Sequence, residues 1–237
     1  MESYCRLLFW NAKVIKPKSF KTLVLSKQED RRTFCFADNW SGVPFCATAF
    51  GKIADTVDRL HLQEGDSISG ECEITFTSKV VNGKKVFNSE KYRIVRLCKG
   101  SPITKETNTE WEMSFIDLKM ADTSTMERKT SSSTGSDYCS FFACDNSSNE
   151  PILFTAFDEE NGKKLCSQLF NMKLKAGDHI SGVADMQFRT KNGRKSIYYS
   201  LKHVQFGHTP TTKEKQANAI ERHDVFKHGI PCGKSFG

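Results

Sequence analysis

Residues 65–70 read GDSISG and residues 177–182 read GDHISG, so one six-residue phrase returns 112 positions later (177 − 65) with a single change. The residues before each copy agree as well. Residues 38–50, DNWSGVPFCATAF, and residues 145–157, DNSSNEPILFTAF, share the pattern D-N-x-x-x-x-P-x-x-x-T-A-F at an offset of 107 (145 − 38). Matching segments in the same order on both sides of the phrase predict an internal duplication.

The residues after each phrase extend the match and indicate what kind of unit is repeated. Asn-Gly followed by two cations occurs at 82–85 and again at 192–195. Between phrase and Asn-Gly, every second residue is apolar or small, which is typical of a strand with one buried face. These positions are Ile68, Gly70, Cys72, Ile74 and Phe76 in the first copy and Ile180, Gly182, Ala184, Met186 and Phe188 in the second. The pattern predicts that Ile68 with Ile180, and Phe76 with Phe188, occupy two equivalent cores, and the glycine predicts a bulge or bend in each strand.

Around each phrase the expected elements follow the same order. The first unit reads as strands at 20–27, 33–37 and 44–50, a helix at 52–62, and strands at 66–78 and 86–97. The second unit reads as strands at 114–120, 138–144 and 151–157, a helix at 160–172, and strands at 178–190 and 196–206. Five strands with a helix between the third and fourth are typical of the OB fold, a partly open Greek-key barrel. We therefore expect a mainly β protein with tandem OB-fold barrels at 1–100 and 101–210 and a C-terminal helix and arm at 211–237.

A family resemblance covers about 60 residues of the first unit. Residues 47–74, ATAFGKIADTVDRLHLQEGDSISGECEI, are followed by the hairpin VVNGKKVFN at 80–88 and by YRIVRL at 92–97. This order resembles the centre of bacterial and phage single-stranded DNA-binding proteins. In that family a strand ending in aromatic-Gly-Lys leads into a helix, then a Gly-plus-charged turn, a Gly-containing strand and a basic hairpin.

The resemblance implies a sequence-tolerant protein that coats or protects single-stranded DNA during replication, recombination or repair, with a phage or mobile element as one possible source. It implies single-stranded DNA as partner, with RNA as an alternative, and replication or recombination proteins as further partners. No cofactor is expected. Because two units in one chain link two sites, a monomer or homodimer would suffice. The alternative, from a different class, is an OB-fold adaptor that binds protein partners or structured RNA.

Composition agrees with a polyanionic partner. The chain has 237 residues with 35 Lys and Arg against 28 Asp and Glu, a formal net charge of +7. A positive charge balance favours association with polyanions. The nine cysteines are scattered without a C-x-x-C pair, which is typical of reduced cysteines. The N-terminus lacks the order of a signal peptide, and no apolar run reaches the ~18 residues of a membrane span, so we expect an intracellular protein without membrane contact.

Binding a single strand requires cations for the phosphates and aromatic faces for the bases. The hairpin between the last two strands of an OB fold flanks its ligand face. In the two units this hairpin carries Lys79, Lys84, Lys85, Arg189, Lys191, Arg194 and Lys195. We interpret these cations as phosphate contacts, against the alternative of ordinary solvated hairpins. Lys52 is added because it stands in the aromatic-Gly-Lys motif of the resemblance.

The stacking candidates are less clearly separated from the core. Trp40 lies in a turn-forming segment, and Phe87, Tyr198 and Tyr199 follow the basic hairpins. Each is either a stacking platform or a core residue. Phe34, Phe36, Phe141 and Phe142 lie on the second strands, where one phase is core and the other ligand face, and the sequence leaves the phase open.

The loop between the first two strands of the second unit differs from its counterpart. Nine of residues 123–136 are Ser or Thr. Such a segment buries little apolar surface and is either a mobile surface loop or a flap that closes on a bound strand through Arg128 and Lys129.

No arrangement for catalysis or metal binding stands out. Residues 229–235, GIPCGKS, lack the first glycine of a phosphate-binding loop, because position 228 is histidine. His223, His228 and Cys232 lack the spacing of a metal site. We therefore expect no catalytic residue and no metal ligand. The segment 211–237 holds five Lys and Arg against three acids, unlike the acidic tail of many members of the resembling family.

Overall fold

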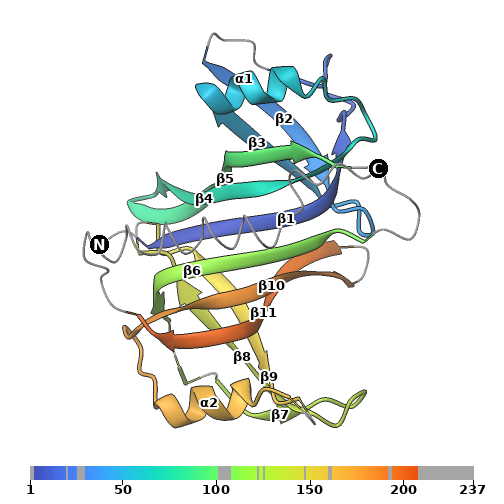
Figure 1. Cartoon of the computed structure of the whole chain (residues 1–237). Coiled ribbons are helices and arrows are strands. Elements are labelled where there is room, and N and C mark those ends of the chain that lie inside the picture. Colours follow the sequence, from blue (N-terminus) through green and yellow to red (C-terminus); the bar gives the residue numbers. More distant parts are fainter. Residues whose placement is uncertain are drawn as a thin grey trace. The chain divides into compact units, whose positions relative to one another are not determined.

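The computed structural model describes residues 3–207 except 20, 26–29, 101–107, 122, 125, 147, 160–161 and 192–193, with backbone alone at 78, 84–89, 189–191 and 194–196. These residues form eleven strands and two helices (Figure 1). The expected C-terminal helix and arm at 211–237 lie outside the described residues. None of the helices within the described ranges is long and apolar enough to cross a membrane.

Barrel 1 is built from five strands and one helix. Its elements are β1 (Tyr4–Ile15), β2 (Arg31–Ala37), β3 (Pro44–Phe50), α1 (Lys52–Arg59), β4 (Ser67–Val81) and β5 (Lys84–Lys99). The strands lie in the order β2-β3-β5-β4-β1, and pairing between β1 and β2 closes the barrel. Only β3 and β5 run parallel among these pairs. This is the strand order of an OB fold.

Barrel 2 repeats the order. Its elements are β6 (Glu110–Met120), β7 (Lys129–Thr130), β8 (Asp137–Cys144), β9 (Pro151–Phe157), α2 (Leu165–Met172), β10 (His179–Lys191) and β11 (Arg194–Phe206). The strands lie in the order β6-β10-β11-β9-β8-β7, and pairing between β6 and β8 closes the barrel. The short β7 is an addition at the edge of β8. The protein is therefore mainly β, with two OB-fold barrels.

The barrels share one continuous sheet because β1 and β6 pair antiparallel. Leu7 faces Met113 at the centre, and the pairs extend symmetrically to Tyr4↔Ile116 and Trp10↔Glu110. Figure 1 shows β1 and β6 side by side in the middle of the sheet, with α1 and α2 at opposite ends. Neither first strand is left as an open edge, which removes a site where other chains could pair.

The first two residues of the repeated phrase, Gly and Asp, lie in a turn before the fourth strand of each barrel. Gly65 and Gly177 have φ of 95° and 91°, a region that favours glycine. Their N–H groups donate to the carbonyls of Val14 and Met120, each at 2.9 Å. The following aspartate, Asp66, accepts a hydrogen bond from a backbone N–H three residues earlier, and Asp178 does the same. The Gly-Asp pair thus fixes where each strand begins.

The last two residues of the phrase accommodate a bulge in the neighbouring first strand. Asn11 and Asp117 have left-handed φ of 58° and 55°, and their N–H groups donate to Ser69 Oγ and Ser181 Oγ, both at 3.1 Å. Gly70 and Gly182, the last residues of the two phrases, each lie against an aromatic ring and a backbone carbonyl of the fifth strand. Ile68 and Ile180 are fully buried, as expected. The positions that are identical in the two phrases therefore have the same structural role in both barrels.

Four expectations about the fold need correction. The first strand is Tyr4–Ile15 and not 20–27, where the described residues make a single bridge, Val24↔Phe34. The bulge at Asn11 shifts the buried phase, and this hides the strand in the sequence. The second helix begins at Leu165 and not at 160, and the first helix ends at Arg59 and not at 62. Phe188 was expected in a core position equivalent to that of Phe76, but it is only partly buried and packs against Phe45 and Trp111.

The cysteines are not all reduced. Cys35 and Cys46 face each other across β2 and β3 and form a disulfide. Cys5, Cys72 and Cys139 are free and buried, and burial raises the pKa of each thiol. The domain boundaries 1–100 and 101–210 stay predictions.

Candidate nucleic-acid interface

Barrel 2 carries a groove of about 850 Å³ on the outer face of β8, β9 and β11, beside the loop that contains β7. We call it the barrel-2 groove. Three aromatic residues line it, one from each strand: Tyr138, Phe157 and Tyr198. The rest of the lining is Glu127, Lys129, Thr130, Ser131, Ser132, Ser133, Thr134, Ser136, Ser140, Leu153, Thr155, Glu159 and Ile197. In OB folds the second and third strands and the flanking loops form the ligand face, which is where this groove lies.

The sheet register brings the first two aromatic rings together. Tyr138 pairs directly with Phe157, and their ring centroids are 5.7 Å apart with an interplanar angle of 30°. All three aromatic residues are partly exposed. A partly exposed ring that is held by a strand has little side-chain entropy left to lose, so it is well suited to stacking on a flat ligand.

Hydroxyl groups cover much of the remaining groove. Ser140 Oγ and Thr155 Oγ1 lie 3.2 Å apart between neighbouring strands. In the loop, Ser131 and Ser136 form a backbone hydrogen bond, and Lys129 and Thr130 pair with β8. The described part of the Ser/Thr-rich loop is therefore a hairpin whose hydroxyls border the groove. Hydroxyls both donate and accept, so they can bind phosphates, sugars or base edges.

The charges around the groove are mixed. Lys129 lines it and lies 3.8 Å from the carboxylate of Glu127. Glu159 adds a second carboxylate. Arg128 points elsewhere: it donates to Ser167 Oγ at 3.2 Å and its guanidinium lies 5.3 Å from the ring centre of Phe170. Arg128 therefore contacts α2, and its closing on a ligand together with Lys129 stays a prediction.

The corresponding surface of barrel 1 is cationic. Arg31 on β2 pairs with Phe50 at the end of β3, Arg93 on β5 lies beside the Phe50 ring, and Lys91 lies two residues before Arg93 on the same side of β5. Arg31 and Lys91 are exposed, and Arg93 lies with its guanidinium 5.8 Å from the ring centre of Phe50. We call these four residues the barrel-1 face. Lys52, at the start of α1, is exposed two residues after Phe50.

The structure describes only part of the basic hairpins between the fourth and fifth strands. Lys79 is exposed on β4. The backbone of both hairpins is paired to the tip, with Val81↔Lys84 in barrel 1 and Lys191↔Arg194 in barrel 2. The side chains of Lys84, Lys85, Phe87, Arg189, Lys191, Arg194 and Lys195 lie outside the described residues. Their role as phosphate contacts stays a prediction.

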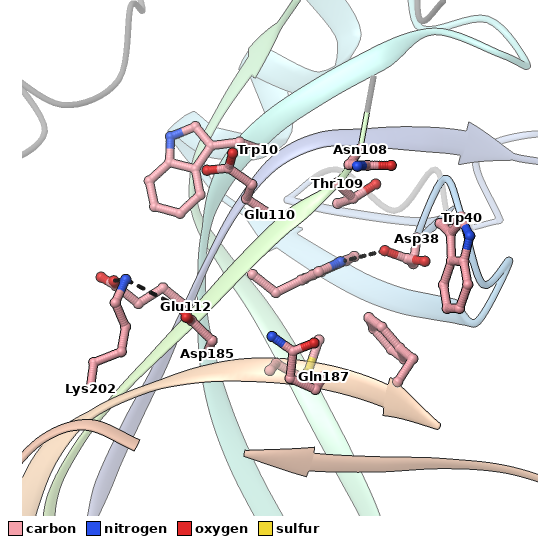
Figure 2. A pocket seen from close by; sticks show the side chains of 13 residues that line it. Trp10, Asp38, Trp40, Asn108, Thr109, Glu110, Glu112, Asp185, Gln187 and Lys202 are labelled. Carbon is pink, nitrogen blue, oxygen red and sulfur yellow. Dashed lines mark hydrogen bonds and ion pairs between the residues drawn. The ribbon is translucent and has the colours of Figure 1, made fainter. Parts of the chain in front are cut away.

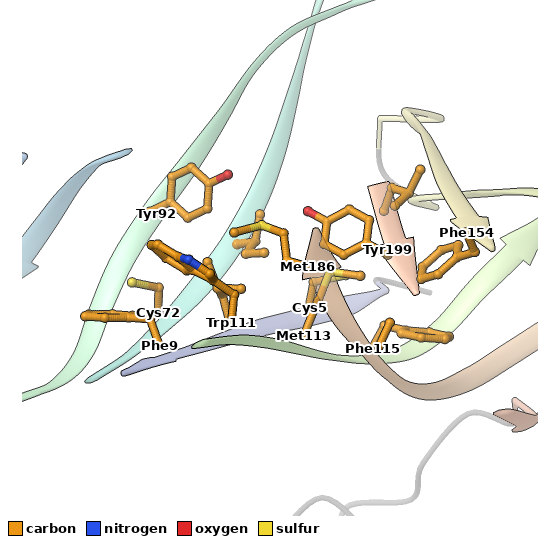
Figure 3. Close-up of a cluster of buried hydrophobic side chains, with 14 of the residues drawn as sticks. Cys5, Phe9, Cys72, Tyr92, Trp111, Met113, Phe115, Phe154, Met186 and Tyr199 are labelled. Carbon is orange, nitrogen blue, oxygen red and sulfur yellow. The ribbon is translucent and has the colours of Figure 1, made fainter. Parts of the chain in front are cut away.

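Tyr199 belongs to the core. It is 6 % exposed and packs on Phe154 at 5.7 Å, and burial raises its pKa well above the usual value. Figure 3 shows its hydroxyl end pointing toward that of Tyr92, which occupies the equivalent place on β5 of barrel 1. The buried ring offers no face to a ligand, so we remove Tyr199 from the candidate interface. The alternation along β11 leaves its neighbour Tyr198 on the outer side.

Trp40 is exposed, at 78 %, but lies away from both surfaces. It borders a pocket of about 540 Å³ where the β2–β3 turn approaches β6 and β10, with Trp10 on the other side (Figure 2). Four carboxylates line this pocket: Asp38, Glu110, Glu112 and Asp185. The lining also includes Lys202, which binds Glu112 at 2.8 Å and Asp185 at 3.2 Å. A phosphate backbone would meet an excess of negative charge here, although the stacking role of Trp40 stays a prediction.

Several residues of the barrel-2 groove and the barrel-1 face could not be identified from the sequence. Tyr138, Phe157, Arg31, Lys91 and Arg93 were not singled out, because the outward phase of the strands was open. The structure settles this phase: Phe34, Phe36 and Phe141 are buried and Phe142 is 41 % exposed. Knowing that Phe141 is buried places Tyr138 on the outside, since residues an odd number of positions apart on a strand face opposite sides.

The fold is similar to that of solved single-stranded DNA-binding proteins. The wild-type single-stranded DNA binding protein from Thermus aquaticus superposes with a TM-score of 0.54 at 11 % identity, covering 90 % of this chain and 97 % of that one. A deletion mutant of the same protein gives 0.50 at 12 % identity, covering 89 % and 97 %. No protein-family model matches the chain, and neither does any curated protein. Within the described residues no group of three or more His, Cys, Asp or Glu side chains is placed to hold a metal ion. At these identities the likeness shows the OB-fold architecture shared by the two chains.

Proposed function

We propose that the chain binds single-stranded DNA without reading its sequence, and that bases stack in the barrel-2 groove. The observation that carries this proposal is the row of Tyr138, Phe157 and Tyr198 on the ligand face of an OB fold. Every base has a flat π-face, so aromatic stacking tolerates any sequence. The structural neighbours, which are named single-stranded DNA binding proteins, support the choice of ligand.

The wider role follows from the ligand. We propose that the protein coats or protects single strands during replication, recombination or repair, by binding alone and without catalysis. Replication or recombination proteins would be its further partners, and a monomer or homodimer would suffice because the chain already holds two barrels. An intracellular location and an origin in a phage or mobile element are part of the same proposal.

Fluorescence anisotropy with a labelled oligo-dT tests the proposal. We expect oligo-dT and a mixed-sequence strand of equal length to bind with similar affinity, and duplex DNA more weakly; RNA of equal length measures the preference for DNA. Tyr198→Ala should lower oligo-dT affinity about 5- to 150-fold, since one stack is worth roughly 1–3 kcal/mol. Phe206→Ala is the matched control, because Phe206 is an exposed aromatic residue on the same strand, away from the groove. Equal losses in both variants, or no binding of single strands by the parent, would exclude the proposal.

A second candidate function, an adaptor that binds a protein segment, is favoured by the pocket beside Trp40. Three tryptophans, of which Trp10 and Trp40 are not buried, and an excess of carboxylates suit a Lys- or Arg-bearing peptide, because cations interact with both carboxylates and aromatic faces. Titration with a Lys-rich peptide, followed by tryptophan fluorescence, separates the two functions. On the adaptor hypothesis Trp40→Ala weakens the peptide and leaves oligo-dT affinity unchanged. If Trp40 stacks on bases, the same variant weakens oligo-dT instead. In either case its melting temperature should stay close to the parent's, because Trp40 is largely exposed.

A further inference from the structure

The two outer faces can be compared position by position, because the sheet registers are equivalent. In barrel 2, Tyr138 pairs with Phe157; in barrel 1, Arg31 pairs with Phe50 at the corresponding place. In each barrel this is the first residue pair of the antiparallel ladder between the second and third strands. Arg31 thus stands where barrel 2 has Tyr138.

The parallel pairs extend the comparison to the fifth strand. Thr155 pairs with Ser200 in barrel 2, and Thr48 pairs with Arg93 in barrel 1. Counting back two residues along each strand places Lys91 where barrel 2 has Tyr198. Three positions therefore differ in the same sense, with cations in barrel 1 and neutral residues, two of them aromatic, in barrel 2.

Two other features of the two faces agree. Thr33 Oγ1 and Thr48 Oγ1 lie 3.0 Å apart, as Ser140 and Thr155 do at 3.2 Å in barrel 2. A phenylalanine ends the third strand in both barrels, at Phe50 and Phe157. The exchange of aromatic residues for cations therefore occurs beside a hydroxyl pair and a phenylalanine that both faces share.

The exchange changes what each face can bind. Phe50 lies beside the Arg93 guanidinium, whereas Phe157 lies beside the Tyr138 ring. Glu73, at 3.6 Å from Arg93, offsets the charge of this exposed guanidinium, and Arg31 and Lys91 add two further exposed cations to the barrel-1 face. The barrel-2 groove has one cation, Lys129, among its described lining, together with two carboxylates. Phosphates are favoured on the first surface and bases on the second.

We infer that the two barrels divide the recognition of one strand: the barrel-1 face binds its phosphates, and the barrel-2 groove stacks its bases. This inference rests on the proposed function and assigns a different chemical group of the ligand to each surface. The barrel-1 face then contributes to the salt dependence of binding, and the barrel-2 groove contributes affinity that requires bases.

Two double variants and two ligands test the division. Arg31→Gln with Lys91→Gln removes two of the three exposed cations of the barrel-1 face. Tyr138→Leu with Tyr198→Leu removes two rings but keeps apolar side chains. The ligands are oligo-dT and an abasic oligomer of the same length, which keeps the phosphates and has no bases. Affinity is measured over a series of salt concentrations, after circular dichroism has shown that each variant is folded.

The division predicts opposite signatures. The barrel-1 variant should weaken both ligands and reduce the log–log salt slope by up to about 1.4, since each phosphate contact on a single strand contributes about 0.7. The barrel-2 variant should weaken oligo-dT at least about fivefold per lost stack, keep the parent's salt slope, and bind the abasic oligomer as the parent does.

Two results would overturn the inference. If the barrel-2 variant also weakens the abasic oligomer, or if both variants change the salt slope equally, the division is wrong while single-strand binding stands. If the parent binds neither ligand, the proposed function fails and the inference falls with it. The two failures are thus distinguishable in one set of titrations.

Discussion

Gly70 and Gly182 show why a short phrase is kept in both barrels. A Cβ at Gly70 would lie 2.4 Å from the Arg96 carbonyl oxygen and 2.9 Å from Phe9 Cζ. At Gly182 the corresponding distances are 2.2 Å to the His203 carbonyl oxygen and 3.0 Å to a carbon of Phe115. Both glycines are needed because a neighbouring strand approaches closely at these positions. From the sequence pattern alone, a glycine here predicts only a bulge or bend.

We expect Gly70→Ala and Gly182→Ala each to lower the free energy of unfolding by about 1–3 kcal/mol, because the added methyl group overpacks against backbone. Thr75→Ala, at an exposed position on β4, serves as control. Urea denaturation of the three variants checks this. Unchanged stability in both glycine variants would show that the strands separate easily at these points.

At the scale of elements, the turn that begins β4 makes stability depend on pH. Burial alone would raise the pKa of Asp66, but hydrogen bonds from Lys99, at 2.6 Å, and from the Gln63 N–H hold it below its usual value. A carboxyl group whose pKa is lower in the folded state stabilises the fold above its unfolded pKa of about 3.9, and this contribution is lost as pH falls through the folded pKa.

Asp66→Asn should therefore be less stable than the parent near neutral pH, and the difference should shrink as the pH falls below about 4. Urea midpoints measured at a series of pH values give the difference directly. A gap that is constant across the series would mean that the Asp66 charge contributes nothing to the turn.

The β4–β5 hairpin is the element where the cation prediction is most easily tested. Replacing Lys79, Lys84 and Lys85 together with Ala should weaken all single strands alike and lower the magnitude of the salt slope by up to about 2, at about 0.7 for each phosphate contact. Anisotropy titrations with two unrelated sequences check both effects. An unchanged slope would identify an ordinary solvated hairpin.

The sequence predicts an element well when the alternation of buried and exposed residues is regular along that element. β4 and β10 alternate cleanly, and the repeat placed them correctly. β1 was missed because the bulge at Asn11 shifts the buried phase and because Leu8 and Trp10 are apolar on the other face. The sequence identifies part of the candidate site. Tyr198 and Lys129 line the barrel-2 groove, whereas Tyr138 and Phe157 depend on a strand phase that tertiary packing decides.

On the scale of the whole molecule, the pairing of β1 with β6 relates the barrels by an approximate two-fold axis. Phe9 lies against Gly70, and Phe115 lies against Gly182 in the same way. Cys5 pairs with Phe115, while Phe9 pairs with Trp111. Equivalent residues thus exchange places across the centre at Leu7 and Met113, as in a symmetric dimer interface. This arrangement agrees with the predicted duplication of one unit, which stays a prediction.

Photocrosslinking tests most directly whether bases stack in the barrel-2 groove. An oligonucleotide that carries 5-iodouracil bonds on irradiation to aromatic side chains that its bases contact, and mass spectrometry of the digested complex identifies them. We expect crosslinks at Tyr138, Phe157 and Tyr198, which compete with unlabelled oligo-dT and disappear with duplex DNA. Specific crosslinks at Trp10 or Trp40, with none on β8, β9 and β11, would contradict the account and place the bases in the pocket between the barrels.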